Sequence, residues 1–420
     1  MFTIGIGSAK IDSLSGITVI SGIGLGLSAV VCAPFVLSKL WDLESQFNTH
    51  KKSVWGPVAR WIINAKYTII GAVQTLFRLK RECGGSISKI MVYPIKSVGV
   101  GLETDEWEVD SHGLKFDREF MLSTWDDKKE AYIPVTQREY ARLAAVRITF
   151  RKTSSESEPL DGVFSFVYPL KDDDVSGEFQ GKSFELPAVV TEEYAVENSS
   201  SKGLHPVDLF GVPLTSYDIT RALPEDFNDQ LGIPKETVLL YSSTGKLVKT
   251  GSPASRLMRD LDSRFRKSLF HDYFPVLIFS EEDVKDLVIK AKEYNIDVQI
   301  NFKSFRPNIL LSGSKAPHDT DNWHQFNIVS KINPREKHKW TVGSKCARCP
   351  MPNVDLTKAE MDKKYPITNT ITKYRRIDPG HRFAVFFGIY GIQHDSGYTI
   401  RVGDSVEIVS RKYMPFVDFE

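Results

Sequence analysis

The chain has 420 residues, of which 41% are hydrophobic and 25% charged, which is enough to bury a sizeable core and predicts two domains. Its formal net charge of +1 at pH 7 gives no overall sign of nucleic-acid binding. Four cysteines in this length fit a reducing compartment and argue against a secreted fold stapled by disulfides.

The first predicted element is a membrane-spanning segment at residues 13–38, inside an N-terminal segment that we place at 1–47. The stretch is rich in Ile, Val, Leu and Gly, and Cys32 is its only ionisable side chain. A spanning helix needs about 20 apolar residues, although a buried helix or an uncleaved targeting segment has the same composition. Several basic residues follow from Lys39 onward, so the positive-inside rule predicts a signal anchor with the C-terminal bulk in the cytosol.

The next predicted element is a basic, membrane-proximal segment at residues 48–83. Lysines and arginines alternate there with tryptophans and aliphatic residues, and the first acid in the segment is Glu82. This mixture is typical of a helix that lies among the headgroups of an anionic membrane, so membrane lipid is an expected partner. The alternatives are a second span and a helix packed on the folded domain.

Beyond Gly84 and Gly85, which form a natural hinge, the pattern predicts a mainly β, barrel-like region with few helices. We divide it into domains at 84–245 and 246–420. The stretch 171–203 is acidic and predicted to be an irregular surface insertion of unassigned role. The short apolar runs that predict strands are 87–93, 106–110, 119–123, 164–167, 382–389 and 398–409.

The clearest predicted helix starts at Ser280. Ser280 and Asp283 form a capping-box pattern, and the apolar residues that follow recur with helical spacing. This stripe is predicted to be core and carries no functional claim.

The most informative pair is Cys346 and Cys349, which lie around Arg348 near the end of the chain. A structural zinc site needs four ligands, and no second cysteine pair or closely spaced histidine pair accompanies them. The prolines that follow predict a loop rather than the helix of a thioredoxin-like site. The pattern favours a thiolate that binds one soft metal centre and is stabilised by Arg348, with a redox pair or two half-buried cysteines as alternatives.

Three basic residues, Lys96, Arg118 and Arg306, lie where predicted strands meet turns. Each alone is typical of a solvated surface charge. Together with a thiolate they predict a clamp for a phosphate-bearing cofactor, because arginine binds phosphate in bidentate fashion. The folded part contains neither a GxxxxGK loop nor a GxGxxG motif, so no nucleotide loop competes for that role.

These segments, in their order along the chain, resemble the MOSC-domain family, and within it the branch of the mitochondrial amidoxime reducing component. The likeness covers nearly everything from residue 87 to 409. The resemblance implies an N-terminal MOSC β-barrel domain followed by a C-terminal MOSC β-barrel domain. It is carried by residues 90–97 (IMVYPIKS), 116–120 (FDREF), 305–308 (FRPN), 321–323 (DNW), 346–349 (CARC) and 354–355 (VD).

The resemblance also implies a molybdenum cofactor, a pterin dithiolene that holds molybdenum, and no pyridoxal phosphate. The metal ligand and catalytic cysteine would be Cys349, with Cys346 as its neighbour, and Arg348 would be a second catalytic residue that lines the metal. A soft thiolate suits a metal already bound to sulfur. Thr136 and Arg138 are weaker candidates. The residues implied to bind the cofactor are Lys96, Ser97, Arg118, Arg306, Asn308 and Arg348.

By the same resemblance, the chain is expected to be a membrane-anchored oxidoreductase that reduces N-hydroxylated compounds such as amidoximes and hydroxylamines. Electrons would come from a cytochrome b5 and its NADH-dependent flavin reductase, and the expected location is the mitochondrial outer membrane. Two alternatives are a carrier of sulfur or of the cofactor, with Cys349 as a persulfide or ligand site, and a non-catalytic membrane tether. Tyr273 and Phe274 depart from the branch, which has small residues there, and we expect them to narrow the substrate pocket.

Overall fold

The computed structural model describes residues 81–153, 161–177, 179–201, 203–242, 246–247, 267–378, 381 and 383–412, together with the isolated residues 65 and 69. The predicted anchor at 13–38 and nearly all of the basic segment at 48–83 lie outside these ranges. Among the described residues, no helix combines the length and apolar character that a membrane crossing requires.

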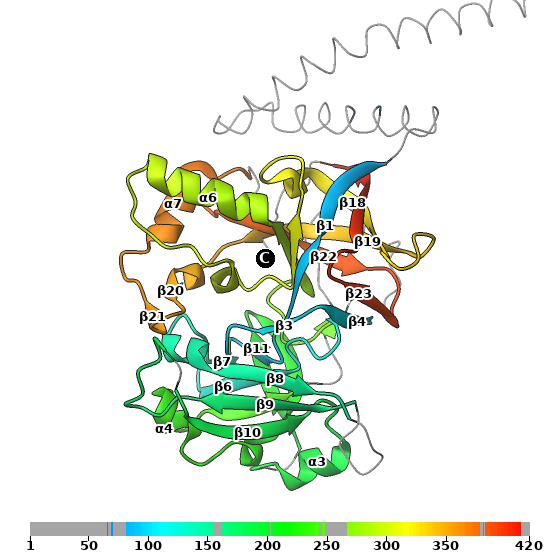
Figure 1. The fold of residues 1–420 in the computed structure, drawn as a ribbon. Coiled ribbons are helices and arrows are strands. Elements are labelled where there is room, and N and C mark those ends of the chain that lie inside the picture. The colour runs from blue at the N-terminus through cyan, green and yellow to red at the C-terminus, as the bar shows by residue number, and fades with distance from the viewer. Residues whose placement is uncertain are drawn as a thin grey trace, which may run out of the picture. The chain divides into compact units, whose positions relative to one another are not determined.

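The larger of two barrels is built mostly from the C-terminal half of the chain (Figure 1). Its strands follow the order β17-β16-β22-β19-β18-β24-β1, and β1 pairs again with β17, so the barrel closes with seven strands. Their bounds are β1 Glu82–Val92, β16 Val276–Ser280, β17 Ile309–Ser312, β18 Trp323–Val329, β19 Lys337–Ala347, β22 Phe386–Gln393 and β24 Ser405–Arg411.

Strand β1 ties the two predicted domains together. It lies at the start of the first domain in sequence, yet it pairs antiparallel with β17 and β24 of the barrel that the second domain builds. Its buried residues Ile87, Ile90 and Val92 join the core of that barrel, with Trp323 and Trp340. A chain cut at residue 84 would therefore lose the beginning of a barrel strand.

Helices α6 (Glu281–Glu293) and α7 (Pro366–Tyr374) accompany this barrel (Figure 1). The capping box predicted at the start of α6 is confirmed: the Ser280 hydroxyl accepts from the Asp283 N–H at 3.2 Å, and the Asp283 carboxylate accepts from the Ser280 N–H at 2.9 Å. Leu287 and Ala291 of the predicted stripe are buried.

A second, smaller barrel belongs to the N-terminal half. Strands β6 (Phe120–Asp126), β7 (Ala131–Pro134), β11 (Leu204–Leu209), β12 (Val212–Asp218) and β13 (Val238–Tyr241) close on themselves, because β13 pairs with both β12 and β6. The short β2 (Ile95–Lys96) pairs in parallel with β6. The prediction of a mainly β, barrel-like folded region is confirmed.

The prediction that residues 171–203 form an irregular insertion holds at its start, where the described residues of 171–181 form turns and bends, and is wrong for the strand and the helix that follow. Lys182–Pro187 form β10, which pairs along its whole length with β9 (Val163–Tyr168), and β9 pairs with β8 (Arg147–Arg151). Phe184 and Leu186 are buried in the core of the N-terminal half. The alternation of these two residues with polar ones is a strand signal that the surrounding acidic composition concealed.

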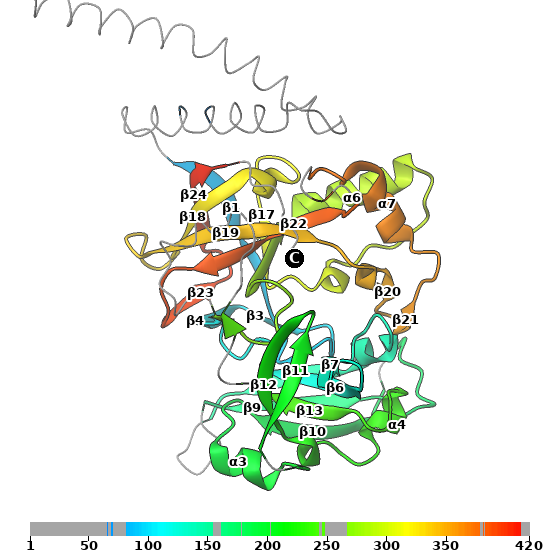
Figure 2. The ribbon, with the colours of Figure 1, turned by 180° about the vertical axis from the view of Figure 1, so that it is seen from behind.

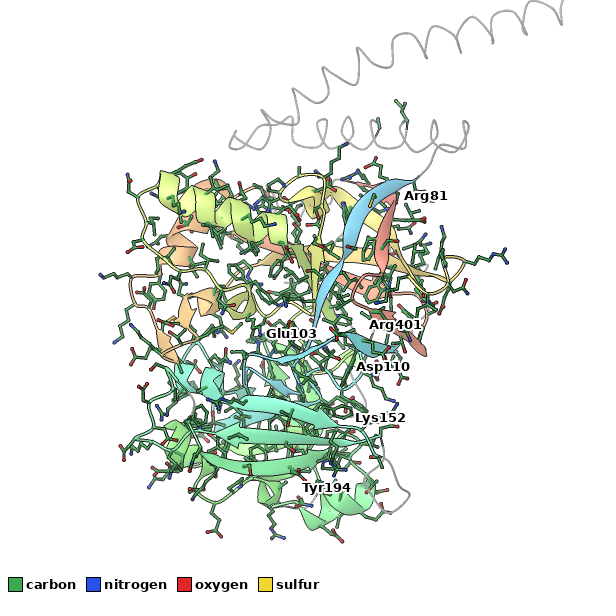
Figure 3. All side chains as sticks on the ribbon, viewed as in Figure 1. Arg81, Glu103, Asp110, Lys152, Tyr194 and Arg401 are labelled. Atoms are coloured by element: carbon green, nitrogen blue, oxygen red, sulfur yellow. The ribbon has the colours of Figure 1, made fainter. Side chains whose placement is uncertain are left out.

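Several short elements complete the structure. Glu103 of β3 lies at the junction between the two halves (Figure 3). It forms ion pairs with Lys303, at 2.9 Å, and with Lys89. The remaining elements are β3 Leu102–Thr104, β4 Glu106–Asp110, β5 Gly113–Leu114, η1 Ala141–Ala145, α3 Glu192–Glu197, η2 Thr220–Ala222, α4 Phe227–Leu231, β14 Lys246–Leu247, β15 Lys267–Ser268, η5 Phe302–Phe305, η6 Asp319–Asn322, η7 Met351–Asn353, β20 Val354–Asp355, β21 Glu360–Met361 and β23 Tyr398–Arg401.

Candidate functional site

The predicted site residues meet in one cavity. Its walls are formed by segments from both halves of the chain. Four of its lining side chains are cations, and among the described residues a single carboxylate, that of Asp272, lines it with them. The predicted residues that line the cavity are Lys96, Ser97, Arg118, Arg306, Asn308, Arg348 and Cys349. Cys346, the predicted neighbour of Cys349, lines it too, as do residues that the sequence analysis did not assign to the site: His271, Asp272, Leu277, Phe305 and Tyr390.

Sharp turns bring three of these residues into the cavity. Ser97, Arg118 and Arg306 adopt left-handed backbone conformations, with φ of 60°, 55° and 56°. Such a conformation costs a residue with a β-carbon about 1–3 kcal/mol and is concentrated at functional sites. Ser97 follows β2, Arg118 precedes β6, and Arg306 ends η5, so rigid elements of both barrels hold the three turns.

Arg118 is held by a buried carboxylate beside it in the chain. Asp117 accepts from the Arg118 guanidinium, from the Tyr93 N–H at 2.7 Å and from His271 Nε2 at 3.1 Å. Because the Leu269 N–H donates to His271 Nδ1, the Nε2 of His271 carries the proton. Burial lowers the pKa of His271 to about 4, against the opposing effect of Asp117, so the ring is neutral near pH 7.

Asn308 fixes the other side of Arg118. Its fully buried side-chain oxygen accepts from Arg118 Nη1 and from the Leu277 N–H, both at 3.1 Å, and its amide nitrogen donates to the Met91 carbonyl at 3.3 Å. The Asn308 side chain is thus engaged within the protein. It orients Arg118 and the strands around it.

The buried ammonium of Lys96 forms an ion pair with Asp272. Burial lowers the pKa of Lys96, and Asp272 opposes this effect. Burial alone would raise the pKa of Asp272, but Lys96 and Arg118 hold it well below its usual range. Since the Asp272 side chain is 49% exposed, water weakens this attraction, and a ligand can reach the carboxylate.

Arg306 is buried without a carboxylate among the described residues to accept its hydrogen bonds. It donates to the carbonyl oxygens of Gly99 at 2.6 Å and Val98 at 3.5 Å, and it lies 4.2 Å from the centre of the Tyr93 ring. Burial, reinforced by the charge of Arg118, lowers the pKa of Arg306 to about 10. A buried cation in this state is a ready partner for an anion.

The two cysteines differ in their surroundings. Cys346 is buried, donates to Tyr390 Oη at 3.3 Å and accepts from Arg348 Nη1 at 3.2 Å, whereas Cys349 is half-buried. Burial raises the pKa of the Cys346 thiol despite the nearby Arg348. Arg348 also donates to the Phe305 carbonyl at 2.9 Å, and its buried Nε has no partner within the described part of the chain.

Two weaker candidates, Thr136 and Arg138, and the aromatic pair Tyr273 and Phe274 differ in whether they line the cavity. Thr136 and Arg138 are not among the described residues that line the cavity. Phe274 lines it, but the side chain is buried and packs in the core around Gly343, where a β-carbon would lie 3.0 Å from the Phe274 ring. Tyr273 is partly exposed and packs against the same core, outside the lining.

Some residues of the site could have been found from sequence. Asp117 adjoins Arg118, and His271 and Asp272 precede the aromatic pair that the resemblance singled out. Tyr390 lies within a fully buried strand, where nothing in its spacing marks it. Chemically, the cavity offers an excess of buried positive charge beside a thiol, which suits an anion and a soft metal.

Comparison with known proteins agrees with this arrangement. The MOSC N-terminal beta barrel domain matches residues 84–181, and the MOSC domain matches residues 266–407. Mitochondrial amidoxime reducing component 2 of Rattus norvegicus is 24% identical over 77% of this chain and 82% of its own length. Molybdenum cofactor sulfurase of Solanum lycopersicum is 26% identical over 76% of this chain, which spans only 35% of that relative.

Among solved structures, the YUAD protein from Bacillus subtilis is 14% identical over 33% of this chain and 64% of its own, with a TM-score of 0.23. That score is too low to compare the folds. The two domain matches cover most of the C-terminal barrel and the segments that line the cavity, whereas β11, β12 and β13 of the N-terminal barrel lie between the matched ranges. This chain is a MOSC-domain protein, in which a MOSC N-terminal beta barrel domain precedes a MOSC domain.

Proposed function

We propose that this protein is a molybdenum cofactor-dependent oxidoreductase that reduces N-hydroxylated substrates such as amidoximes and hydroxylamines. The observation that carries the proposal is the cavity itself, where four cations and one carboxylate accompany the half-buried Cys349. The rat relative, whose name describes an amidoxime reducing component, supports the choice of substrate.

The residues present fit such a cofactor. A phosphate would supply acceptors for the buried Arg306, which donates to carbonyl oxygens, and for Lys96, whose ion-pair partner is the half-exposed Asp272. The Ser97 hydroxyl lies beside Lys96 in the same lining, and Arg118 is already oriented by Asp117. Cys349 would provide the thiolate ligand for the metal.

When bound, the cofactor supplies two electrons and a metal that accepts the substrate oxygen. The balance is R–NHOH + 2 e⁻ + 2 H⁺ → R–NH₂ + H₂O. The chain positions the reactants. Two side chains of the cavity wall also carry protons: burial raises the pKa of both Cys346 and Tyr390, which leaves the thiol and the phenol protonated at neutral pH. Arg348 bridges this wall to the Phe305 carbonyl and holds a positive charge beside the thiols.

We further propose that electrons arrive from a cytochrome b5 and its NADH-dependent flavin reductase. The N-terminal segment would hold the enzyme on the cytosolic face of a membrane, and we propose the mitochondrial outer membrane. The apolar run at 13–38 and the basic segment after it support the anchor.

A second candidate function follows from the sulfurase match. In that case Cys349 would carry a persulfide or hold the cofactor for delivery to another enzyme. The third alternative, a membrane tether without catalysis, gives no role to four cations gathered around one cavity.

The deciding experiment uses the full chain, purified in detergent from a host that makes the cofactor. Molybdenum is measured by elemental analysis, pterin by oxidative fluorescence, and turnover of an amidoxime with a reduced viologen dye, so that no protein donor is needed. Near-stoichiometric molybdenum with turnover is the expected result. Cys349→Ser should retain a folded barrel and lose at least about 100-fold in turnover, because a metal ligand is removed.

The other outcomes are equally clear. Cofactor without turnover, together with a persulfide on Cys349 detected by mass spectrometry, would favour the carrier. A folded chain with neither molybdenum nor pterin would contradict both proposals and leave the tether.

The anchor is tested by deleting residues 1–80, which keeps the whole of β1. The full chain should sediment with membranes, and the shortened chain should stay in the supernatant with its cofactor. A shortened chain that still sediments with membranes would place the membrane contact in the folded part.

A further inference from the structure

Phe210 is an exposed aromatic residue at the tip of the hairpin formed by β11 and β12. Leu209 pairs with Val212, so the connecting loop consists of Phe210 and Gly211 alone. Figure 2 shows this hairpin extending from the N-terminal barrel toward the other half of the protein. Both loop residues have positive φ, 53° and 82°, which is the backbone of a type I′ turn.

Phenylalanine is a poor choice for that turn. The first position of a type I′ turn strongly favours Asn, Asp or Gly, because the left-handed conformation crowds a larger side chain. The tip is nevertheless well held: Asp208 accepts from the Gly211 N–H at 2.7 Å and lies 3.5 Å from the Lys129 ammonium. A rigid turn that retains an unfavourable residue suggests that the side chain has a function.

The Phe210 ring lies over the cationic edge of the site. Its centre is 5.2 Å from the ammonium of Lys96 and 5.9 Å from the guanidinium of Arg138. Lys96 lines the cavity and is paired there with the half-exposed Asp272. Phe210 is still 50% exposed, so it presents apolar surface to solvent beside Lys96, which lines the cavity.

We propose that Phe210 determines substrate specificity, as a platform on which a flat, apolar part of the substrate stacks while its polar end enters the cavity. This inference rests on the proposed function and assigns a role to Arg138, which supports the ring from outside the cavity lining. Aromatic rings attract one another beyond their area burial, and Lys96 and Arg138 hold the ring through cation–π contacts.

The test compares an aromatic amidoxime with a small aliphatic one of the same charge, on the cofactor-loaded full chain. Phe210→Asn should raise KM for the aromatic substrate about tenfold and leave the aliphatic KM and both kcat values within about twofold. Phe210→Tyr keeps the ring and should match the wild type. Trp125→Asn, which removes a 46%-exposed aromatic residue of the same barrel outside the cavity lining, is the matched control and should change neither KM.

A second readout needs no turnover. Because Asn suits a type I′ turn, Phe210→Asn should raise Tm by about 1–3 °C while it weakens binding of the aromatic amidoxime in calorimetry. A purely structural role for Phe210 would lower Tm instead. Equal losses for both substrates, or a fall in kcat, would show that the ring acts only by shielding Lys96, and would overturn the proposal.

The proposed function and this inference can fail separately. If the wild type reduces neither amidoxime, the proposed function fails, and calorimetry still decides the role of Phe210. Tighter binding of the aromatic compound to the wild type than to Phe210→Asn would then support the platform. Equal affinities would reject it.

Discussion

Two groups of buried cations in this protein have opposite surroundings. Away from the cavity, the two buried cations in the described part of the chain are each matched by a carboxylate: Arg375 donates to both oxygens of Asp321 at 2.9 and 2.8 Å, and Lys345 donates to Asp378 at 2.9 Å. These pairs connect strands, helices and loops of the C-terminal half. Their hydrogen bonds offset the cost of taking both charges out of water.

At the cavity the matching is incomplete. Arg118 and Lys96 pair with Asp117 and Asp272. Arg306 and Arg348 instead donate to carbonyl oxygens and a thiol, and within the described part of the chain no carboxylate pairs with either. Burying a cation without an acid is costly, so such charges persist where a ligand supplies the missing partner. Matched cations thus belong to the fold, whereas unmatched ones indicate where an anion binds.

The largest effect that this comparison predicts is a loss of stability when a matched pair, Arg375 and Asp321, is broken. Asp321→Asn leaves Arg375 buried beside a neutral amide, so the free energy of unfolding in urea should fall by about 3–5 kcal/mol. Replacing both residues by apolar ones, Arg375→Met with Asp321→Leu, should recover most of that loss. A single variant that lost less than about 1 kcal/mol would show that the pair does not stabilise the fold.

Replacing a buried cation that lacks a carboxylate should lower cofactor binding rather than stability. Arg306→Met removes a buried cation that lacks a carboxylate, so the stability of the cofactor-free chain should stay within about 1 kcal/mol of the wild type or rise. Its molybdenum and pterin content should fall about 100-fold, because a phosphate contact is lost. Arg401→Met, at a surface ion pair with Glu106 (Figure 3), is the control and should change neither quantity. Full cofactor content in Arg306→Met would contradict the distinction between matched and unmatched cations.

Much of the fold could be predicted because its signals are local. The strand predicted at 106–110 coincides with β4, and the capping box at Ser280 starts α6 where expected. The run predicted at 398–409 is really two strands, β23 and β24, separated by a turn at Gly403 with φ of 93°. A glycine in that conformation ends a strand, but the sequence around it keeps the same alternation.

The candidate site could be predicted only in part. Lys96, Arg118 and Arg306 are marked by their position beside prolines and strand ends, and all three line the cavity. The contact between His271 and Asp117 joins residues 154 positions apart, and such closure depends on how two barrels pack. No local pattern encodes it. Phe210 was missed because its signal is a backbone conformation, which only the structure reveals.

The smallest predicted effect concerns Glu119, a partly buried acid near Asp110. Burial, with help from Asp110, raises the pKa of Glu119 to about 8. Between its ordinary pKa near 4.5 and this value the folded chain binds more protons than the unfolded chain, so the contribution of Glu119 to stability is complete below pH 4.5 and is lost as pH rises through 8.

Glu119→Gln mimics the protonated acid and lacks this loss. The variant should match the wild type in urea denaturation at pH 5 and exceed its free energy of unfolding by about 1–2 kcal/mol at pH 9, after allowance for partial solvent access. Parallel stability curves for the two proteins would mean that folding does not raise the pKa of Glu119.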